Sequence, residues 1–115
     1  MTTETKCPCL ETCPINMVLK LIGGKWKLQI LCALYNDGTT RFNTLKKKMD
    51  GISNAALANA LKELEDDKLI FRTQYNEIPP RVEYSLAPCC NTLMPIIEQL
   101  TTWNYERILS MQHEQ

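Results

Sequence analysis

Histidine, net charge and long apolar runs are scarce or absent in this chain of 115 residues. The one histidine, His113, lies near the C-terminus, and no Cys/His, Ser/His or paired-carboxylate arrangement is visible. The sequence therefore predicts that the protein is not an enzyme and needs no cofactor. No run of about 18 or more apolar residues occurs, so no transmembrane helix is expected. Residues 1–6 lack the apolar centre of a secretory signal, which predicts a cytoplasmic protein.

The formal net charge of zero does not by itself indicate a nucleic-acid partner. The charges are nevertheless segregated along the chain. Residues 41–62 contain five basic side chains and one acidic side chain, whereas residues 63–67 contain four acidic ones. This pattern permits a basic face on a neutral protein, and a solvated surface of mixed charge is the alternative.

Length and hydrophobic periodicity predict one domain over residues 13–115, preceded by a flexible arm over residues 1–12. The expected fold is mainly α with a small β-hairpin: a winged helix-turn-helix with additional N- and C-terminal dimerisation helices. The predicted elements are helices at about 13–22, 25–35, 43–49, 53–66 and 88–111, a minor strand within 39–42, and a hairpin wing at about 70–86.

The fourth predicted helix, at about 53–66, has the features of a DNA-reading helix. Ser53 can cap its N-terminus, and Leu57, Leu61 and Leu64 fall within one narrow arc. The opposite side carries small and amide side chains such as Asn59, which leave room for a close approach and can pair with adenine edges. Acidic side chains come only at the C-terminal end, where a recognition helix leaves the groove.

The first and last predicted helices each carry an apolar stripe. The last helix has little of its own chain left to pack against, so the stripes predict a homodimer. The alternative is that this helix folds back on its own core. Pro95 is expected to kink or break it, because proline lacks an N–H and crowds the carbonyl four residues earlier. The predicted interface residues are Ile15, Val18, Leu93, Ile96, Ile97, Leu100 and Trp103.

Several segments between Cys13 and Trp103 resemble the HxlR family of bacterial transcriptional regulators. The resemblance implies a dimeric winged-helix protein related to the MarR-type regulators, with the fourth helix as the recognition helix. The segments that carry it are Cys13-Pro14, Leu21-Ile22-Gly23-Gly24-Lys25-Trp26, Arg41-Phe42-Asn43-Thr44-Leu45, Gly51-Ile52-Ser53, Leu61-Lys62-Glu63-Leu64-Glu65 and Pro79-Pro80-Arg81-Val82-Glu83-Tyr84-Ser85-Leu86.

The chain departs from the family pattern at two places. The family usually has a glycine near the end of the recognition helix, where this chain has Asp67-Lys68, so that helix must end without the residue best suited to a left-handed cap. After the second wing strand the family commonly reads L-T-P-x-G, and this chain reads Leu86-Ala87-Pro88-Cys89-Cys90.

Binding to double-stranded DNA is the function that these features predict, with a pseudo-palindromic operator as the partner of a homodimer. Basic side chains would contact phosphates, and the start of the recognition helix would read bases. The alternative is a winged-helix protein-interaction module without DNA binding. The predicted DNA-binding residues are Lys25, Lys27, Arg41, Lys46, Lys47, Ser53, Asn54, Ala55, Ala58, Asn59, Lys62 and Arg81.

Cys13 is the candidate redox-sensing residue. It precedes a helix-initiating proline, where the aligned peptide dipoles stabilise a thiolate. The resemblance adds that some family members use a cysteine at this position to sense oxidants, quinones or aldehydes. The alternative is an unreactive, partly buried thiol. The possible resolving thiols are Cys7, Cys9, Cys89 and Cys90.

No metal site is predicted. Cys7, Cys9 and Cys13 are one ligand short of a tetrahedral zinc site, and neither spacing matches a common zinc motif. Cys89 or Cys90 completes such a site only if the arm folds toward the last helix. In a reducing compartment the cysteines are expected to be thiols rather than permanent disulfides, with Cys32 in the core.

Overall fold

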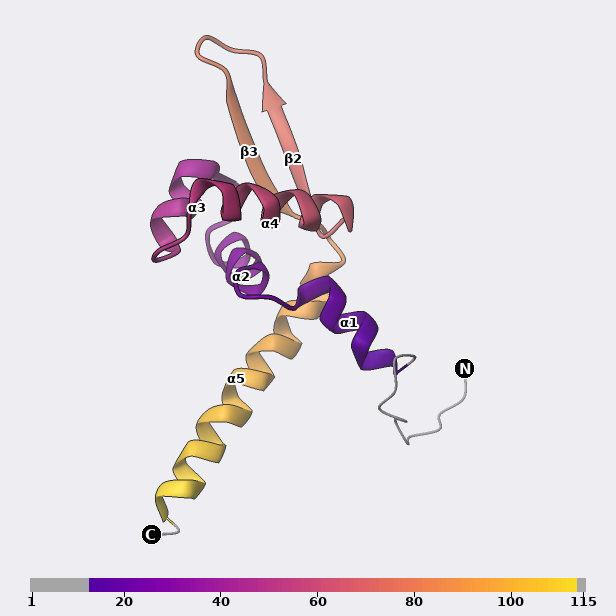
Figure 1. Ribbon diagram of the computed structural model, residues 1–115, viewed down its shortest axis with the longest axis vertical. Coiled ribbons are helices and arrows are strands. Elements are labelled where there is room, and N and C mark those ends of the chain that lie inside the picture. Colours follow the sequence, from indigo (N-terminus) through magenta and orange to yellow (C-terminus); the bar gives the residue numbers. More distant parts are fainter. Residues whose placement is uncertain (1–12, 114–115) are drawn as a thin grey trace.

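Residues 13–113, which the computed structural model describes, form five helices and a small antiparallel sheet. Helices α2, α3 and α4 gather beneath the β2–β3 hairpin, and α1 and α5 project from this body in different directions (Figure 1). The predicted winged helix-turn-helix fold is confirmed. The elements are α1 (Pro14–Ile22), α2 (Lys27–Asp37), β1 (Thr40–Arg41), α3 (Phe42–Lys48), α4 (Asn54–Asp66), β2 (Ile70–Tyr75), β3 (Arg81–Leu86) and α5 (Cys90–His113).

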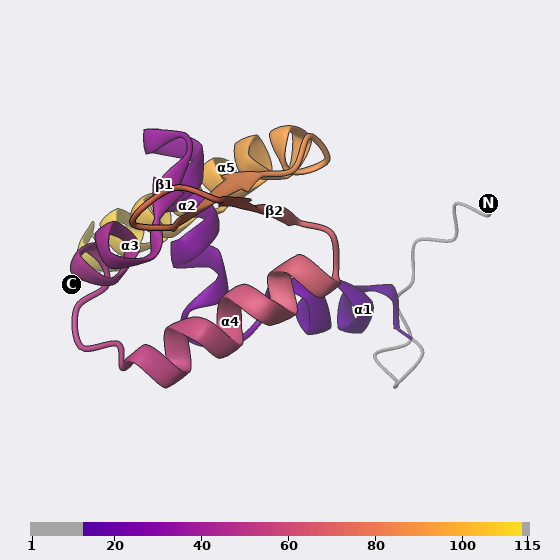
Figure 2. The same ribbon diagram turned by 90° about the horizontal axis from the view of Figure 1, so that it is seen from above.

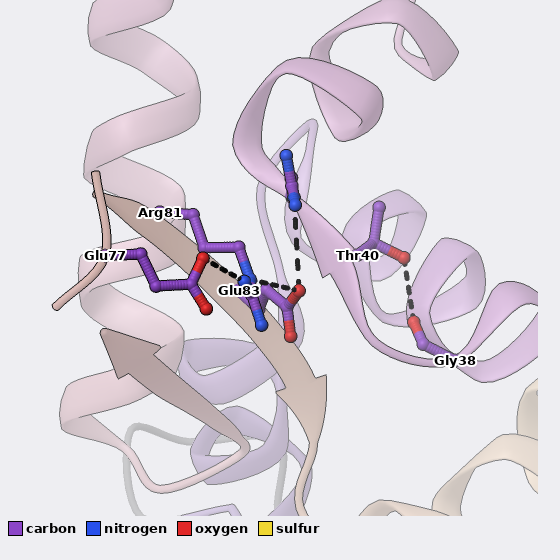
Figure 3. Close-up of polar contacts among 6 residues, drawn as sticks. Gly38, Thr40, Glu77, Arg81 and Glu83 are labelled. Carbon is purple, nitrogen blue, oxygen red and sulfur yellow. Dashed lines mark hydrogen bonds and ion pairs between the residues drawn. The ribbon is translucent and has the colours of Figure 1, made fainter. Parts of the chain in front are cut away.

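The minor strand expected within residues 39–42 forms as β1 and completes a sheet of order β1-β3-β2. Thr40 pairs with Tyr84 and Arg41 with Glu83, whereas the wing register runs from Ile70 opposite Leu86 to Tyr75 opposite Arg81. Buried Thr40 donates its hydroxyl to the Gly38 carbonyl at 2.8 Å (Figure 3), which satisfies the polar group in the core.

One apolar core holds α2, α3 and α4 against the base of the sheet. The division of α4 into a buried and an outward side follows the predicted arc, since Leu57, Leu61 and Leu64 are at most 1% exposed. Full burial of one such side chain stabilises the fold by about 1.5–3 kcal/mol. The core is made of Ile22, Ile30, Leu31, Leu34, Leu45, Met49, Ile52, Leu57, Ala60, Leu61, Leu64, Leu69, Ile70, Tyr84, Cys90 and Met94.

The helix starts agree with the sequence prediction at two of three caps. Cys13 is the N-cap of α1 with Pro14 as the first helical residue, and the Ser53 hydroxyl accepts a hydrogen bond from the Ala56 N–H at 3.0 Å. The third helix, predicted at about 43–49, begins at Phe42, because Arg41 occupies its N-cap. The break expected near Pro95 does not occur, and α5 continues through it.

The end of α4 is a Schellman motif with a lysine where glycine is usual. The Leu69 N–H donates to the Leu64 carbonyl at 2.9 Å, and the Lys68 N–H donates to the Glu65 carbonyl at 3.0 Å. This geometry requires a left-handed residue at position 68, and Lys68 adopts it with φ of 64°. The departure from the family pattern therefore leaves the helix end intact but strains one residue.

Within residues 13–113, none of the helices combines the length and the apolar character needed to cross a bilayer.

Candidate nucleic-acid interface

The outward side of α4 is open to solvent over its first two turns. In the view from above, α4 lies along one edge of the molecule, and only its inner side contacts α2 and the sheet (Figure 2). From Ser53 to Lys62 this side carries short, amide and basic side chains and no carboxylate. The exposed positions are Ser53, Asn54, Ala55, Ala58, Asn59 and Lys62.

Charge along α4 changes sign between its two ends. The N-terminal turn has no acidic residue, so the unpaired N–H groups leave partial positive charge there. At the other end Lys62 contacts Asp66 at 3.2 Å, and Glu63 forms an ion pair with Lys27 at 2.7 Å. The N-terminal half is thus the part of α4 that best accommodates a polyanion.

The predicted phosphate-binding lysines differ in their availability. Lys46 and Lys47 in the last turn of α3 form no ion pair within residues 13–113, and Lys25 is exposed with its ammonium 4.8 Å from the centre of the Trp26 ring. Lys27 is held by Glu63, and its side chain is only 12% exposed. Lys27 must lose this ion pair before it can reach a phosphate.

The tip of the wing is charge-balanced, not basic as the sequence pattern suggests. The Arg81 guanidinium lies between Glu77, at 2.5 Å, and Glu83, at 3.1 Å (Figure 3), and stacks on the Tyr75 ring at 4.0 Å. Arg41 approaches the same Glu83 carboxylate at 4.0 Å. Hydrogen bonding to Glu77, then to Glu83, raises the pKa of Arg81 above its usual value, so the pair stays ionised.

The shared face of Arg81 and Glu83 could have been predicted from the sequence. Period two places Arg81 and Glu83 on one face of β3, and Arg41 joins that face because it pairs with Glu83. Arg72, on the opposite face of the hairpin, is exposed and forms no ion pair within the described part of the chain. Arg72 is therefore the guanidinium of the wing that is most available to an anion.

Residues 21–112 match the protein-family model for the HxlR-like helix-turn-helix. This range includes all the candidate DNA-binding residues described above. The chain belongs to the HxlR family. It is accordingly an HTH-type transcriptional regulator and not an enzyme.

The most informative relatives are one sequence and two solved structures. The chain is 44% identical over 94 residues to the uncharacterized HTH-type transcriptional regulator BH0655 of Halalkalibacterium halodurans, covering 82% of this chain and 83% of that protein. The oxidized form of the redox regulator HypR has a TM-score of 0.74 and 38% identity, covering 82% of this chain and 96% of that one. A MarR-family transcriptional regulator from Enterococcus faecalis has a TM-score of 0.78 and 37% identity, covering 86% and 89%.

In this HxlR-family chain the apolar stripes on α1 and α5 are largely uncovered by the chain itself. Ile96, Leu100 and Trp103 are 55%, 56% and 60% exposed, and α5 extends away from the body (Figure 1). Ile15 and Val18 of α1 are also exposed. The predicted interface residues at the start of α5 behave differently, since Leu93 and Ile97 pack partly against the core.

The cysteines occupy unequal environments. Cys13 is disulfide-bonded and 1% exposed, so the expectation of thiols is wrong for this residue. Cys32, Cys89 and Cys90 are free. Cys89 and Cys90, proposed as resolving thiols, are thus not paired with Cys13; Cys7 and Cys9 lie outside the described residues. Burial and the nearby Glu98 carboxylate raise the pKa of half-buried Cys32, which contacts the core as predicted.

Proposed function

We propose that this regulator binds a pseudo-palindromic DNA operator as a homodimer and reads its sequence with the outward side of α4. The observation that carries the proposal is the carboxylate-free surface from Ser53 to Lys62, which is exposed along its length. Such a surface suits a helix that enters the major groove, because it places no negative charge beside the phosphates on either side.

Base reading falls to the start of α4. Asn54 and Asn59 are exposed amides of the kind that makes two hydrogen bonds to adenine. Ala55 and Ala58 have short side chains, so the helix backbone can approach the bases. Their methyl groups can make apolar contact with the methyl group of thymine. The Ser53 hydroxyl caps α4, so Ser53 would contribute to DNA binding by fixing the start of α4 and not by contacting bases.

Phosphate contacts fall to the cations that are free to move. Lys25, Arg41, Lys46 and Lys47 are the four candidates that the ion pairs leave most available. Lys27 and Arg81 are held by carboxylates, and their contribution would require exchange of an ion pair. Exposed Arg72 is an additional candidate on the wing.

Dimerisation through α1 and α5 would set the spacing of the two reading helices. A two-fold axis along this surface would cover the exposed Leu100 and Trp103 side chains. The two copies of α4 would then lie about 34 Å apart, one helical turn of DNA.

Control by thiol modification at Cys13 completes the proposal. Cys13 sits at the N-cap of α1, two residues before the exposed interface residue Ile15. Oxidation would join it to a second thiol, with two protons and two electrons passing to an oxidant such as diamide. Cys7 and Cys9 are the resolving thiols we favour, because Cys13 is disulfide-bonded while Cys89 and Cys90 are free. The similarity to HypR, a redox regulator solved in an oxidized form, supports control by oxidation in general.

Alanine substitution of Asn59 tests the reading helix. Asn59→Ala should weaken operator binding by about 1–3 kcal/mol, roughly 10-fold to 100-fold, and relax the preference at one base position. Asn91→Ala, which removes an exposed amide from the first turn of α5, is the matched control. Equal affinity and equal sequence preference in the two variants would remove α4 from the interface.

Loss of the Cys13 sulfur tests the control mechanism separately. The operator affinity of the reduced, unsubstituted chain should fall on diamide treatment, and that of reduced Cys13→Ser should not. An equal loss of operator affinity in diamide-treated Cys13→Ser would show that another cysteine senses the oxidant.

A protein-interaction module without DNA binding is the second candidate. The observation that favours it is the charge-balanced wing tip, where Glu77 and Glu83 neutralise Arg81. Binding to duplex DNA that weakens steeply with salt separates the two functions.

A further inference from the structure

Two adjacent cysteines stand at the junction between the wing and α5. Cys89 is exposed, and Cys90, the first residue of α5, is 1% exposed and belongs to the core. Both are free thiols. Neither is used by the DNA-binding surface, and Cys90 stands where the usual family pattern has glycine.

The two thiols converge on one strip of backbone. Successive side chains of a regular helix diverge by about 100°. Here the Cys89 thiol is 3.8 Å from the Lys68 carbonyl oxygen, and the Cys90 thiol is 3.4 Å from the carbonyl oxygen of the next residue, Leu69. The adjacent Cys89 also contributes to the raised pKa of Cys90, as expected for two neighbouring thiols. The fold therefore holds two sulfur atoms side by side, with one of them open to solvent.

We propose that the Cys89–Cys90 pair is a binding site for trivalent arsenicals. Thiolate sulfur is a soft ligand that selects soft, thiophilic centres. A monosubstituted arsenical such as phenylarsine oxide needs two sulfurs, which is the number available here. Zinc requires four ligands, and within residues 13–113 no group of three or more His, Cys, Asp or Glu side chains is placed to hold a metal ion.

The reaction is a condensation in which no electrons are transferred. Two As–S bonds form, the As–O bond breaks, and the two thiol protons leave with that oxygen as water. The product is a ring containing arsenic, both sulfurs and the backbone between the two residues.

Exposure fixes the order of the two bonds. Cys89 reacts first because its sulfur meets solvent. Burial, then the adjacent Cys89, raises the pKa of Cys90 to about 11, so Cys90 enters the second step as a thiol. Its attack is intramolecular and benefits from a high effective concentration. Ring closure releases the thiol hydrogen bonds at Lys68 and Leu69, where α4 ends and β2 begins.

Intact-mass measurement with phenylarsine oxide tests the site. The full chain carries Cys7→Ser, Cys9→Ser and Cys13→Ser, so that only Cys32, Cys89 and Cys90 remain. One arsenical adduct per chain is expected; it should survive excess 2-mercaptoethanol and be removed by 2,3-dimercaptopropanol. Absence of this adduct from the folded protein would overturn the proposal.

Single substitutions in the same background identify the sulfurs. Cys89→Ser should weaken binding by about 100-fold or more, whereas Cys32→Ser should bind as the background does. Cys89 is exposed, so its replacement leaves the core unchanged, and circular dichroism checks the fold. Undiminished binding by Cys89→Ser would overturn the proposal. The number of arsenicals bound by the reduced chain with all its cysteines is a second measurement. In that chain Cys89→Ser should bind one equivalent fewer than the unsubstituted protein.

Discussion

Lys68 holds the left-handed position that ends α4, with φ of 64°. A side chain in this conformation costs roughly 1–2 kcal/mol, and glycine avoids that cost. Lys68→Gly should therefore raise the free energy of unfolding by about 1 kcal/mol, measured by urea denaturation. Lys68→Ala removes the same charge but keeps a Cβ, and it should give little gain. Equal stability of the glycine and alanine variants would contradict the strain assigned to this residue.

Cys90 links stability to pH. Its pKa is about 11 in the folded chain and about 8.5 in an unfolded one. Because the pKa of the thiol is higher in the folded chain, its contribution to the free energy of unfolding is complete below about pH 8.5. That contribution is lost as the pH rises toward 11. The stability advantage of the unsubstituted chain over Cys90→Ala should narrow between pH 8.5 and 10.5 in urea titrations. A constant difference would show that the thiol ionises as it does in water.

At the scale of elements, Glu83 restrains the cations of the wing. It contacts Arg81 at 3.1 Å and Arg41 at 4.0 Å. Glu83→Gln should release Arg41 and leave Arg81 held by Glu77 alone. It should tighten binding to non-specific duplex DNA several-fold, about 1 kcal/mol or less. Glu106→Gln makes the same charge change on exposed α5 and should have a smaller effect. Equal effects in fluorescence anisotropy would show that the wing does not approach the DNA.

The elements themselves follow from local patterns in the chain. Spacings of three and four among Leu57, Leu61 and Leu64 predicted α4, and period two predicted β2 and β3. The helix start at Ser53 followed from cap chemistry. The pairing of Arg81 with two carboxylates was missed because alternation assigns a face and does not say which charges on that face meet.

At the scale of the whole molecule, α5 is the main element of the proposed dimer interface. Trp103 is 60% exposed near the middle of its apolar stripe. Trp103→Glu places a charge in the proposed interface and should shift the dimer toward monomer in sedimentation velocity. Gln112→Glu adds a charge to another exposed part of α5 and should leave the assembly unchanged. Sedimentation of Trp103→Glu as a dimer would place the interface elsewhere.

Sequence left two outcomes for this helix, packing on its own core or on a second chain. The structure shows the first outcome only for the start of the helix, because Leu93 and Ile97 touch the core while Leu100 and Trp103 are exposed. Periodicity finds an apolar stripe but cannot say where along the helix its own core ends. The environment of Cys89 and Cys90 was likewise hidden, since it depends on the end of α4 meeting the start of α5.

Salt dependence of DNA binding tests the account most directly. Log Kd for a duplex carrying the promoter beside the gene should be measured between 50 and 200 mM salt by anisotropy, about the range over which phosphate contacts are lost. The account predicts a steep loss of affinity with salt. Lys47→Ala removes one proposed contact per protomer, two per dimer, and should reduce the log–log slope by about 1.8. Lys20→Ala, on exposed α1, should leave the slope unchanged. A shallow salt response, or equal slopes for the two variants, would contradict DNA binding by this surface.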